Sequence, residues 1–124
     1  MPKKTQAQLR HDCLVLNTAE QVLILPIQEI LYARANTSYT LFVEVSGKAW
    51  SMSKPLRHFE ANLISLGFFR IHRSYMVNLQ HLRRLDKVEG LAYLINEEAV
   101  AYNTDHAKKL TQLSEEWAPL LQLR

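Results

Sequence analysis

The residues with the clearest chemical potential form a cationic segment in the middle of the chain. No acidic residue lies between Glu60 and Asp86, and the same stretch holds four arginines, Arg70, Arg73, Arg83 and Arg84, together with His72 and His81. Around Arg70 the cations alternate with apolar residues, so we expect apolar side chains to pack inward while cations project from a strand end and its loop. Such cations suit phosphate oxygens, and arginine can also fork onto guanine O6 and N7. The alternatives are a solvated basic face, or an ion pair between Arg70 and a carboxylate elsewhere in the fold.

The length and composition around this segment are those of one globular domain. With 124 residues the chain can bury a core without disulfides or metals, and a single cysteine, Cys13, excludes an internal disulfide. The formal net charge of +3 is compatible with a nucleic-acid partner but does not require one. The chain shows no secretory signal, and no apolar run approaches the ~20 residues of a membrane span. We therefore expect a cytoplasmic protein without membrane insertion.

Catalytic and metal-binding patterns are weak in this sequence. There are only 3 glycines and no glycine-rich phosphate loop, and the 5 histidines lack metal-ligand spacing. His11 and Cys13 lie close together, but one such pair is too little for catalysis or for a metal site. We therefore expect no enzyme activity, no metal and no cofactor.

The elements that must position the cationic segment are mostly short strands. Apolar runs separated by turn residues predict strands at 13–16, 22–25, 30–35, 39–45, 48–52, 68–71, 76–77, 82–88, 91–95 and 99–102. In the run at 39–45, Tyr39 and Leu41 fall on one face and Thr40 falls on the other. Short polar residues at 36–38 predict a turn just before this run.

Two helices are predicted, far apart in the sequence. The first covers 53–66, with Ser53 as its cap and Gly67 as its stop, and the second begins with Thr104 as its cap and bends or ends at Pro119. This separation argues against a helix-turn-helix, which needs two adjacent helices. Residues 1–12 are predicted to form a flexible basic tail and residues 13–124 to form the domain.

Residues 68–78 form one extended motif, Phe-Phe-Arg-Ile-His-Arg-Ser-Tyr-Met-Val-Asn. This motif closely resembles the pattern F-x-R-x-H-x-S-x-x-V-N of the LytTR DNA-binding domain, and the resemblance extends over roughly residues 20–113. It implies a mostly β fold, an elongated stack of short antiparallel sheets with one internal helix and a C-terminal helix. It also implies that loops, rather than a recognition helix, enter successive major grooves of double-stranded DNA.

Residue by residue, the resemblance implies a first DNA-contacting loop from residue 36 to residue 40. Tyr39 falls about where the family places a base-contacting side chain. Ser38 or Thr40 could take that role instead, through contact with a base or a phosphate. The alternative is that Tyr39 simply packs on its strand.

The second implied loop carries the cationic motif. Arg73 takes the position that contacts the groove, while Arg70 and His72 resemble residues that bind phosphate or fix the loop. Ser74 and Asn78 are expected to support the loop by hydrogen bonding to its backbone. Of the three implied contacts, this one is the most complete.

The third implied site is the turn at 102–109, and here the sequence departs from the family pattern. His106 stands where the family often has a base-contacting arginine, and histidine is shorter and a poorer fork. Asp105 beside it would repel phosphate, whereas Lys108 and Lys109 could still reach the DNA backbone. Beyond the three sites, the exposed strand cations Arg83 and Arg84 are either further phosphate contacts or plain surface residues.

The resemblance therefore predicts a bacterial transcription regulator that binds double-stranded DNA sequence-specifically, commonly as two copies on direct repeats or as a homodimer. The alternatives are a protein-interaction module on the same fold with weak or lost DNA binding, motivated by Asp105 and His106, and an RNA-binding module, because exposed aromatics near cations can stack bases. Only about 20 residues precede the matched region, so we expect no receiver domain and control by abundance, a regulatory partner protein or self-association. The C-terminal helix is expected to close the core or to form a dimer face.

Overall fold

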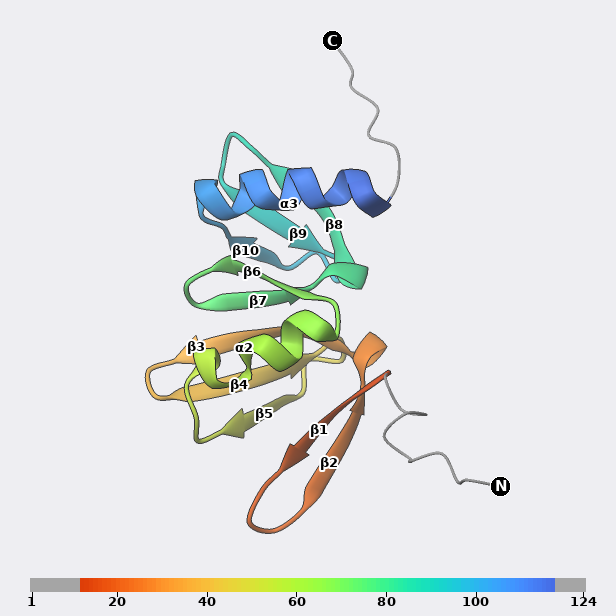
Figure 1. The fold of residues 1–124 in the computed structure, drawn as a ribbon, viewed down its shortest axis with the longest axis vertical. Helices are drawn as coiled ribbons and strands as arrows, with labels where there is room; N and C mark the ends of the chain where they lie inside the picture. The colour runs from red at the N-terminus through yellow and green to blue at the C-terminus, as the bar shows by residue number, and fades with distance from the viewer. Residues whose placement is uncertain (1–11, 118–124) are drawn as a thin grey trace, which may run out of the picture.

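Residues 12–117 are described in a computed structural model of the chain, and they form three antiparallel sheets stacked along the longest axis (Figure 1). The strands are β1 (Cys13–Asn17), β2 (Val22–Pro26), β3 (Ile30–Asn36), β4 (Tyr39–Glu44), β5 (Ala49–Met52), β6 (Phe68–His72), β7 (Tyr75–Asn78), β8 (Leu82–Asp86), β9 (Leu91–Leu94) and β10 (Ala99–Ala101). The helices are η1 (Ile27–Glu29), α2 (Leu56–Ser65), η2 (Leu79–His81) and α3 (Thr104–Trp117). The predicted fold class is confirmed.

The five-stranded sheet is the middle layer, and its strand order decides which segments meet. The order is β5-β4-β3-β7-β6, and every neighbouring pair is antiparallel. Strands β5, β3 and β6 therefore run in the same direction and end at the same edge. The β1–β2 hairpin lies on one side of this sheet, and the three-stranded sheet β10-β9-β8 lies on the other side (Figure 1). Helix α3 lies at the same end of the molecule as the three-stranded sheet and also contacts β6 (Figure 1).

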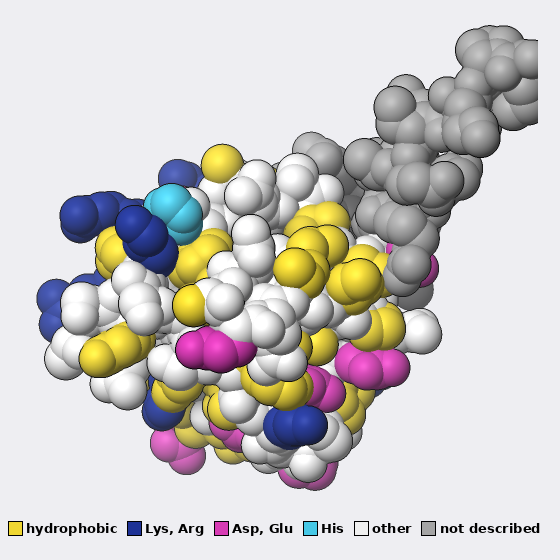
Figure 2. Space-filling model, turned by 90° about the horizontal axis from the view of Figure 1, so that it is seen from below, with side chains coloured by type: hydrophobic (Ala, Val, Ile, Leu, Met, Phe, Trp, Pro, Cys, Tyr) yellow, Lys and Arg dark blue, Asp and Glu magenta, His cyan; other side chains and the backbone are white. Residues whose placement is uncertain are grey.

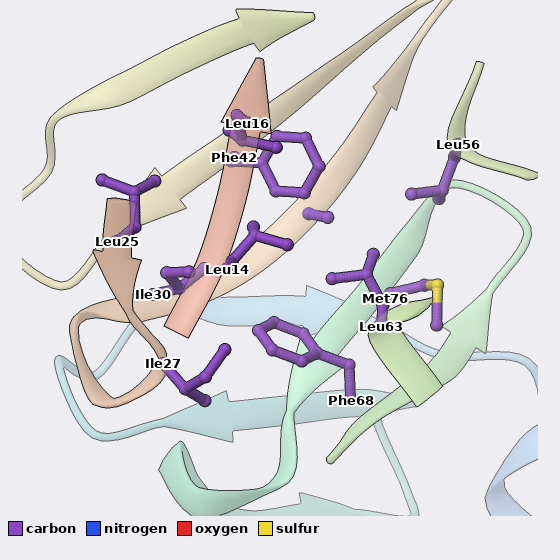
Figure 3. Packing of buried hydrophobic residues seen from close by; sticks show 11 residues of the cluster. Leu14, Leu16, Leu25, Ile27, Ile30, Phe42, Leu56, Leu63, Phe68 and Met76 are labelled. Atoms are coloured by element: carbon purple, nitrogen blue, oxygen red, sulfur yellow. The ribbon is translucent and has the colours of Figure 1, made fainter. Parts of the chain in front are cut away.

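Both faces of the five-stranded sheet are buried, each in its own hydrophobic core. Figure 3 shows the core between one face, the hairpin and α2, where these side chains point toward one another: Leu14, Leu16, Leu25, Ile27, Ile30, Phe42, Leu56, Leu63, Phe68 and Met76. The second core joins the other face to the three-stranded sheet and α3 through Leu31, Tyr32, Ile71, Val77, Ala92, Leu94, Val100 and Leu110. Neighbours such as Met76 and Val77 alternate between the two cores, as the two-residue period of a strand requires.

Two bulges interrupt this alternation. The pairing register shifts between Ile30 and Tyr32 in β3, and again between Arg70 and His72 in β6. A bulge adds one residue to one strand and rotates the side chains that follow it. The bulge in β6 lies directly before the turn that carries Arg73, so it sets the direction in which that turn leaves the sheet.

The helix ends differ from the predicted caps. Helix α2 begins after Pro55, not after Ser53, and has no side-chain cap. It ends before Gly67, whose φ of +95° lies in the left-handed region that favours glycine. At the start of α3, Asn103 takes the capping position predicted for Thr104, because its Oδ1 accepts the backbone N–H of Asp105 at 2.8 Å.

The predicted strands all occur, with ends that differ by at most two residues. Both short 3-10 helices were missed, because three-residue turns leave no periodic pattern in the sequence. The predicted tail at 1–12, except for Asp12, and the predicted break at Pro119 lie outside the described residues. None of the helices within residues 12–117 is long and apolar enough to cross a membrane.

Asn78 connects the middle sheet to the segment that leads into it. Its side chain is fully buried, and Nδ2 donates to the carbonyl oxygens of Ile27 at 2.9 Å and Ile30 at 2.8 Å. Oδ1 accepts the backbone N–H of Gln80 at 3.0 Å. Asn78 was predicted to support the loop that carries Arg73, and this prediction is wrong. Asn78 is the last residue of β7, whereas that loop precedes the first residue of β7.

We expect Asn78→Ala to lower the free energy of unfolding by about 3 kcal/mol, because it removes all three hydrogen bonds of a fully buried polar side chain. Urea unfolding followed by circular dichroism measures the change. Asn17→Ala is the matched control, since Asn17 is exposed at the end of β1 and should change stability by less than about 0.5 kcal/mol. Equal midpoints for the two variants would contradict this role of Asn78.

Candidate nucleic-acid interface

The predicted DNA-contacting segments meet at one edge of the molecule. Strands β3 and β6 are parallel, so the β3–β4 turn and the β6–β7 turn leave the same edge of the sheet. The backbone N–H of Ala35 donates to the carbonyl of Ser74 at 2.8 Å, which joins these two turns. The backbone N–H of Asn103 donates to the carbonyl of Ile71 at 2.9 Å, which brings the start of α3 to the same place.

The β3–β4 turn presents a small polar tip. Thr37 adopts a φ of 55°, and its Oγ1 donates to the carbonyl of Asn36 at 2.6 Å, a local bond that accompanies this left-handed conformation. Ser38 and Tyr39 follow it and are exposed, with 47% of Tyr39 accessible. The tyrosine therefore projects from the turn instead of packing fully on its strand.

Thr40, predicted as a DNA contact, lies on the buried side of β4. It has no accessible surface, and its Oγ1 donates to the carbonyl of Lys54 at 2.7 Å. The prediction for Thr40 is wrong because both faces of this sheet are covered, so a residue one place further along the strand points into the core. Its hydroxyl instead attaches the loop before α2 to the first turn.

Arg70 fixes the turn between β6 and β7. Its Nη1 forms an ion pair with Glu60 of α2, its Nε donates to the carbonyl of His72 at 3.2 Å, and its Nη2 donates to the carbonyl of Arg73. Only 22% of its side chain is exposed. The predicted phosphate contact is therefore not supported, and the loop-fixing alternative agrees with these bonds.

His72 supports the same turn from inside. Its Nδ1 accepts the backbone N–H of Ser74 at 3.1 Å, and its ring centroid lies 6.1 Å from that of Tyr75. Because Nδ1 acts as an acceptor, the proton of the neutral ring is on Nε2. Ser74 supports the loop through its backbone N–H and carbonyl, both of which are hydrogen bonded.

Arg73 lies at the tip of this turn and is exposed. Among the side chains and backbone groups that the structure describes, none forms a hydrogen bond or ion pair with its guanidinium, although its carbonyl is bonded to Arg70. The turn thus combines a backbone that is fixed from two sides with an unengaged cationic fork. Because the backbone of the turn is already ordered, less conformational entropy is lost when Arg73 contacts a planar acceptor.

The start of α3 is less suited to contact DNA. His106 lies against α2 and β6, where it lines a cavity together with Glu60 and Arg70, and its Nδ1 is buried without a partner among the described residues. This position does not favour the predicted base contact, since one ring nitrogen is directed into the domain. Lys108 and Lys109 are exposed on different sides of α3, and only Lys109 lines the same cavity as His106.

The other cations of the central stretch are engaged within the domain. Arg84 places its guanidinium 3.7 Å from the ring centroid of Tyr93, and Arg83 donates to the carbonyls of Gln80 and Leu82. His81 is buried, and its Nε2 lies 2.5 Å from the carbonyl oxygen of Gln28. Arg83 and Arg84 therefore agree with the surface alternative, and His81 belongs to the core.

Comparisons with known proteins agree with this architecture. The family model described as LytTr DNA-binding domain matches residues 20–115. The chain belongs to the LytTR family of DNA-binding domains.

Similar proteins place the LytTR domain among bacterial relatives. It is 31% identical over 85 residues to the transcriptional regulatory protein YpdB of Escherichia coli K12 and, at the same identity, to YpdB of Shigella flexneri. The match covers 68% of this chain but 34% of each relative, so the chain spans about a third of their length. A solved LytTr DNA-binding domain from Bacillus cereus has the same fold, with a TM-score of 0.67, 23% identity, and coverage of 83% of this chain and 96% of that one.

The structure adds cations that the motif analysis missed. Lys54 and Arg57 are exposed at the start of α2, and the bond from Thr40 to Lys54 places this start beside the β3–β4 turn. Arg34 is half-buried in β3 opposite Tyr75, in the strand that leads to the same edge. Figure 2 shows most of the visible Lys and Arg side chains, together with His, gathered at the left of the view, whereas Asp and Glu lie mainly over the rest, where further Lys or Arg side chains also occur.

A buried tyrosine connects this edge of the LytTR domain to the three-stranded sheet. The Tyr32 hydroxyl donates to Glu98 Oε2 at 2.5 Å, and its ring lies edge-on to that of Tyr75, with 5.6 Å between centroids. Burial raises the pKa of Tyr32 well above its usual range, and the hydrogen bond and charge of Glu98 raise it further. The phenol of Tyr32 therefore stays protonated and acts as a donor. The ring of Tyr75 packs between those of Tyr32 and His72, which holds it in place.

We expect Arg70→Lys to loosen the β6–β7 turn without unfolding the domain, because an ammonium cannot make the three-way fork of a guanidinium. Loss of about 1 kcal/mol of local stability would speed amide hydrogen exchange at Ser74 and Ala35 about fivefold. Arg83→Lys is the control, since Arg83 is bonded only near η2. An unchanged rate of amide hydrogen exchange at Ser74 in Arg70→Lys would show that Arg70 does not fix the β6–β7 turn.

Proposed function

We propose that this LytTR domain binds double-stranded DNA sequence-specifically, as the DNA-binding part of a bacterial transcription regulator. The observation that carries the proposal is the β6–β7 turn, where Arg73 is exposed and unengaged while Arg70 and His72 fix its backbone. Arginine can bond both O6 and N7 of guanine in the major groove, and that geometry requires a well-placed guanidinium. A turn of this size can enter a groove without a recognition helix.

The residues around Arg73 supply the sequence-independent part of binding. Lys54 and Arg57 are exposed near the first turn, and cations at such positions suit the phosphates that flank a groove. Tyr39 and Ser38 project from the β3–β4 turn and can donate hydrogen bonds to a base or a phosphate. In this proposal Arg73 and Tyr39 contact bases, whereas Lys54 and Arg57 contact phosphates of the DNA backbone.

The third contact is weaker in this proposal than is expected for the family. His106 is directed toward α2, so Lys108 and Lys109 are left for phosphate contacts from α3. More of the specificity then rests on Arg73. Similarity to proteins named transcriptional regulatory protein supports a role in transcription, with a second copy on the same DNA and a regulatory partner as further parts of the proposal.

We expect Arg73→Ala to weaken binding to a selected DNA site by about 1–3 kcal/mol and to relax the preference at one base pair. Sites enriched from a random duplex library, followed by fluorescence anisotropy, give both quantities. Arg84→Ala is the control, because it removes an equal charge whose guanidinium already stacks on Tyr93.

Two results would contradict sequence-specific binding of duplex DNA. If no sequence is enriched at about 50 mM salt and Arg73→Ala behaves like the wild type, sequence-specific DNA binding by this domain is wrong. Binding of structured RNA in preference to duplex DNA under the same conditions would likewise contradict the proposal.

We expect Lys54→Gln to weaken binding to all duplexes alike, because a phosphate contact carries no sequence information. The slope of log K against log salt should become shallower by about 1, and the base preferences should stay the same. Titrations at four salt concentrations measure the slope. A changed base preference in Lys54→Gln would show that Lys54 contacts a base instead.

A further inference from the structure

A cavity of about 440 Å³ lies between α2, β6 and α3, next to Arg70, which fixes the turn that carries Arg73. Its apolar lining includes Ile64 of α2, Phe69 of β6 and Leu79 of η2. Ile64 is 54% exposed, so its apolar side chain is accessible at the rim of the cavity. A volume of this size lies within the range of small-molecule sites in proteins.

The charged groups of this cavity are unequal in sign. Arg70 and Lys109 line it together with a single carboxylate, Glu60, and that carboxylate is already paired with Arg70. Lys109 is exposed, and Glu60 is the one acidic residue among those that line the cavity. The lining therefore carries one more positive charge than negative charge beside its apolar side chains. An occupant with an apolar body and a negative group satisfies both properties of the lining.

The cavity is connected to the turn through one side chain. Arg70 lines the cavity with its guanidinium paired to Glu60, and the same guanidinium donates to the carbonyls of His72 and Arg73. An anion that enters the cavity competes with Glu60 for this guanidinium. Because the fork has a fixed geometry, a shift of Arg70 toward the anion changes its bonds to the turn.

The geometry points to a binding site for a small organic carboxylate between α2, β6 and α3, whose occupation alters the position of the Arg73 turn. The site would give this LytTR domain a direct response to a metabolite-sized anion. The inference rests on the proposed function only in one respect, the expected effect of the bound carboxylate on DNA binding. Binding and its effect on the turn are observable without DNA.

The test uses 4-phenylbutyrate as the probe and the neutral 4-phenylbutanamide as its matched compound, with the full-length chain labelled with ¹⁵N. We expect saturable chemical-shift changes at the amides of Ile64, Gly67 and Lys109 with the carboxylate, together with changes at His72 and Arg73. The amide compound should bind about tenfold more weakly, since it lacks the charge that Lys109 and Arg70 attract.

Three variants separate the site from a general charge effect. Lys109→Gln should weaken the probe about fivefold, the size expected for a partly exposed ion pair. Lys87→Gln removes an equal charge from another, exposed part of the surface and should leave the affinity unchanged. Ile64→Glu, which places a negative charge at the rim, should abolish binding.

The inference is overturned by any of three results. These are no saturable shift up to about 10 mM probe, equal affinity for the amide compound, or shifts that stop at the lining residues and leave His72 and Arg73 unchanged. If the wild type fails to bind the probe but a chain ending at Trp117 binds it, residues 118–124 occupy the site and the inference is also wrong. Failure of DNA binding alone contradicts the proposed function and leaves this inference standing.

Discussion

Coverage of the five-stranded sheet on both faces is the constraint on which the rest of this structure depends. An antiparallel sheet commonly leaves one face to water, but here the hairpin and α2 cover one face and the three-stranded sheet with α3 covers the other. Polar groups inside such a sheet must find partners, because an unpaired buried polar group is costly. Asn78 and Thr40 accordingly bond backbone carbonyls of neighbouring segments, and these bonds connect the layers.

The same constraint produces the rigidity of the edge that we propose contacts DNA. With the sheet covered, the turns can leave only at its ends, and the parallel direction of β3 and β6 brings two of them together. Arg70 then bonds two carbonyls of one turn while it is paired to Glu60 on a different element. A surface ion pair alone contributes about 0–1 kcal/mol, so the value of this pair lies in placing the guanidinium rather than in its own energy.

Charge in this domain separates into engaged and unengaged cations. Arg70, Arg83 and Arg84 are bonded or stacked within the domain, whereas Arg73, Lys54 and Arg57 are exposed near one edge. The modest net charge of +3 therefore understates the local positive field at the turns. The engaged arginines also explain why a count of cations in the central stretch overestimates the number that can reach a polyanion.

The sequence by itself determined the strands, the two separated helices and the family motif, because these depend on local periodicity and on residue types at fixed spacing. It left open whether Arg70 contacts phosphate or pairs with a carboxylate, and it misassigned Thr40, Asn78 and the cap of α3. The outcomes for Arg70, Thr40 and Asn78 depend on neighbours that are distant in the sequence: Glu60 lies ten residues from Arg70, Lys54 lies 14 residues from Thr40, and Ile27 lies 51 residues from Asn78. Only the tertiary structure decided them, since a side chain's role follows from which face is covered and which partner lies within hydrogen-bond distance.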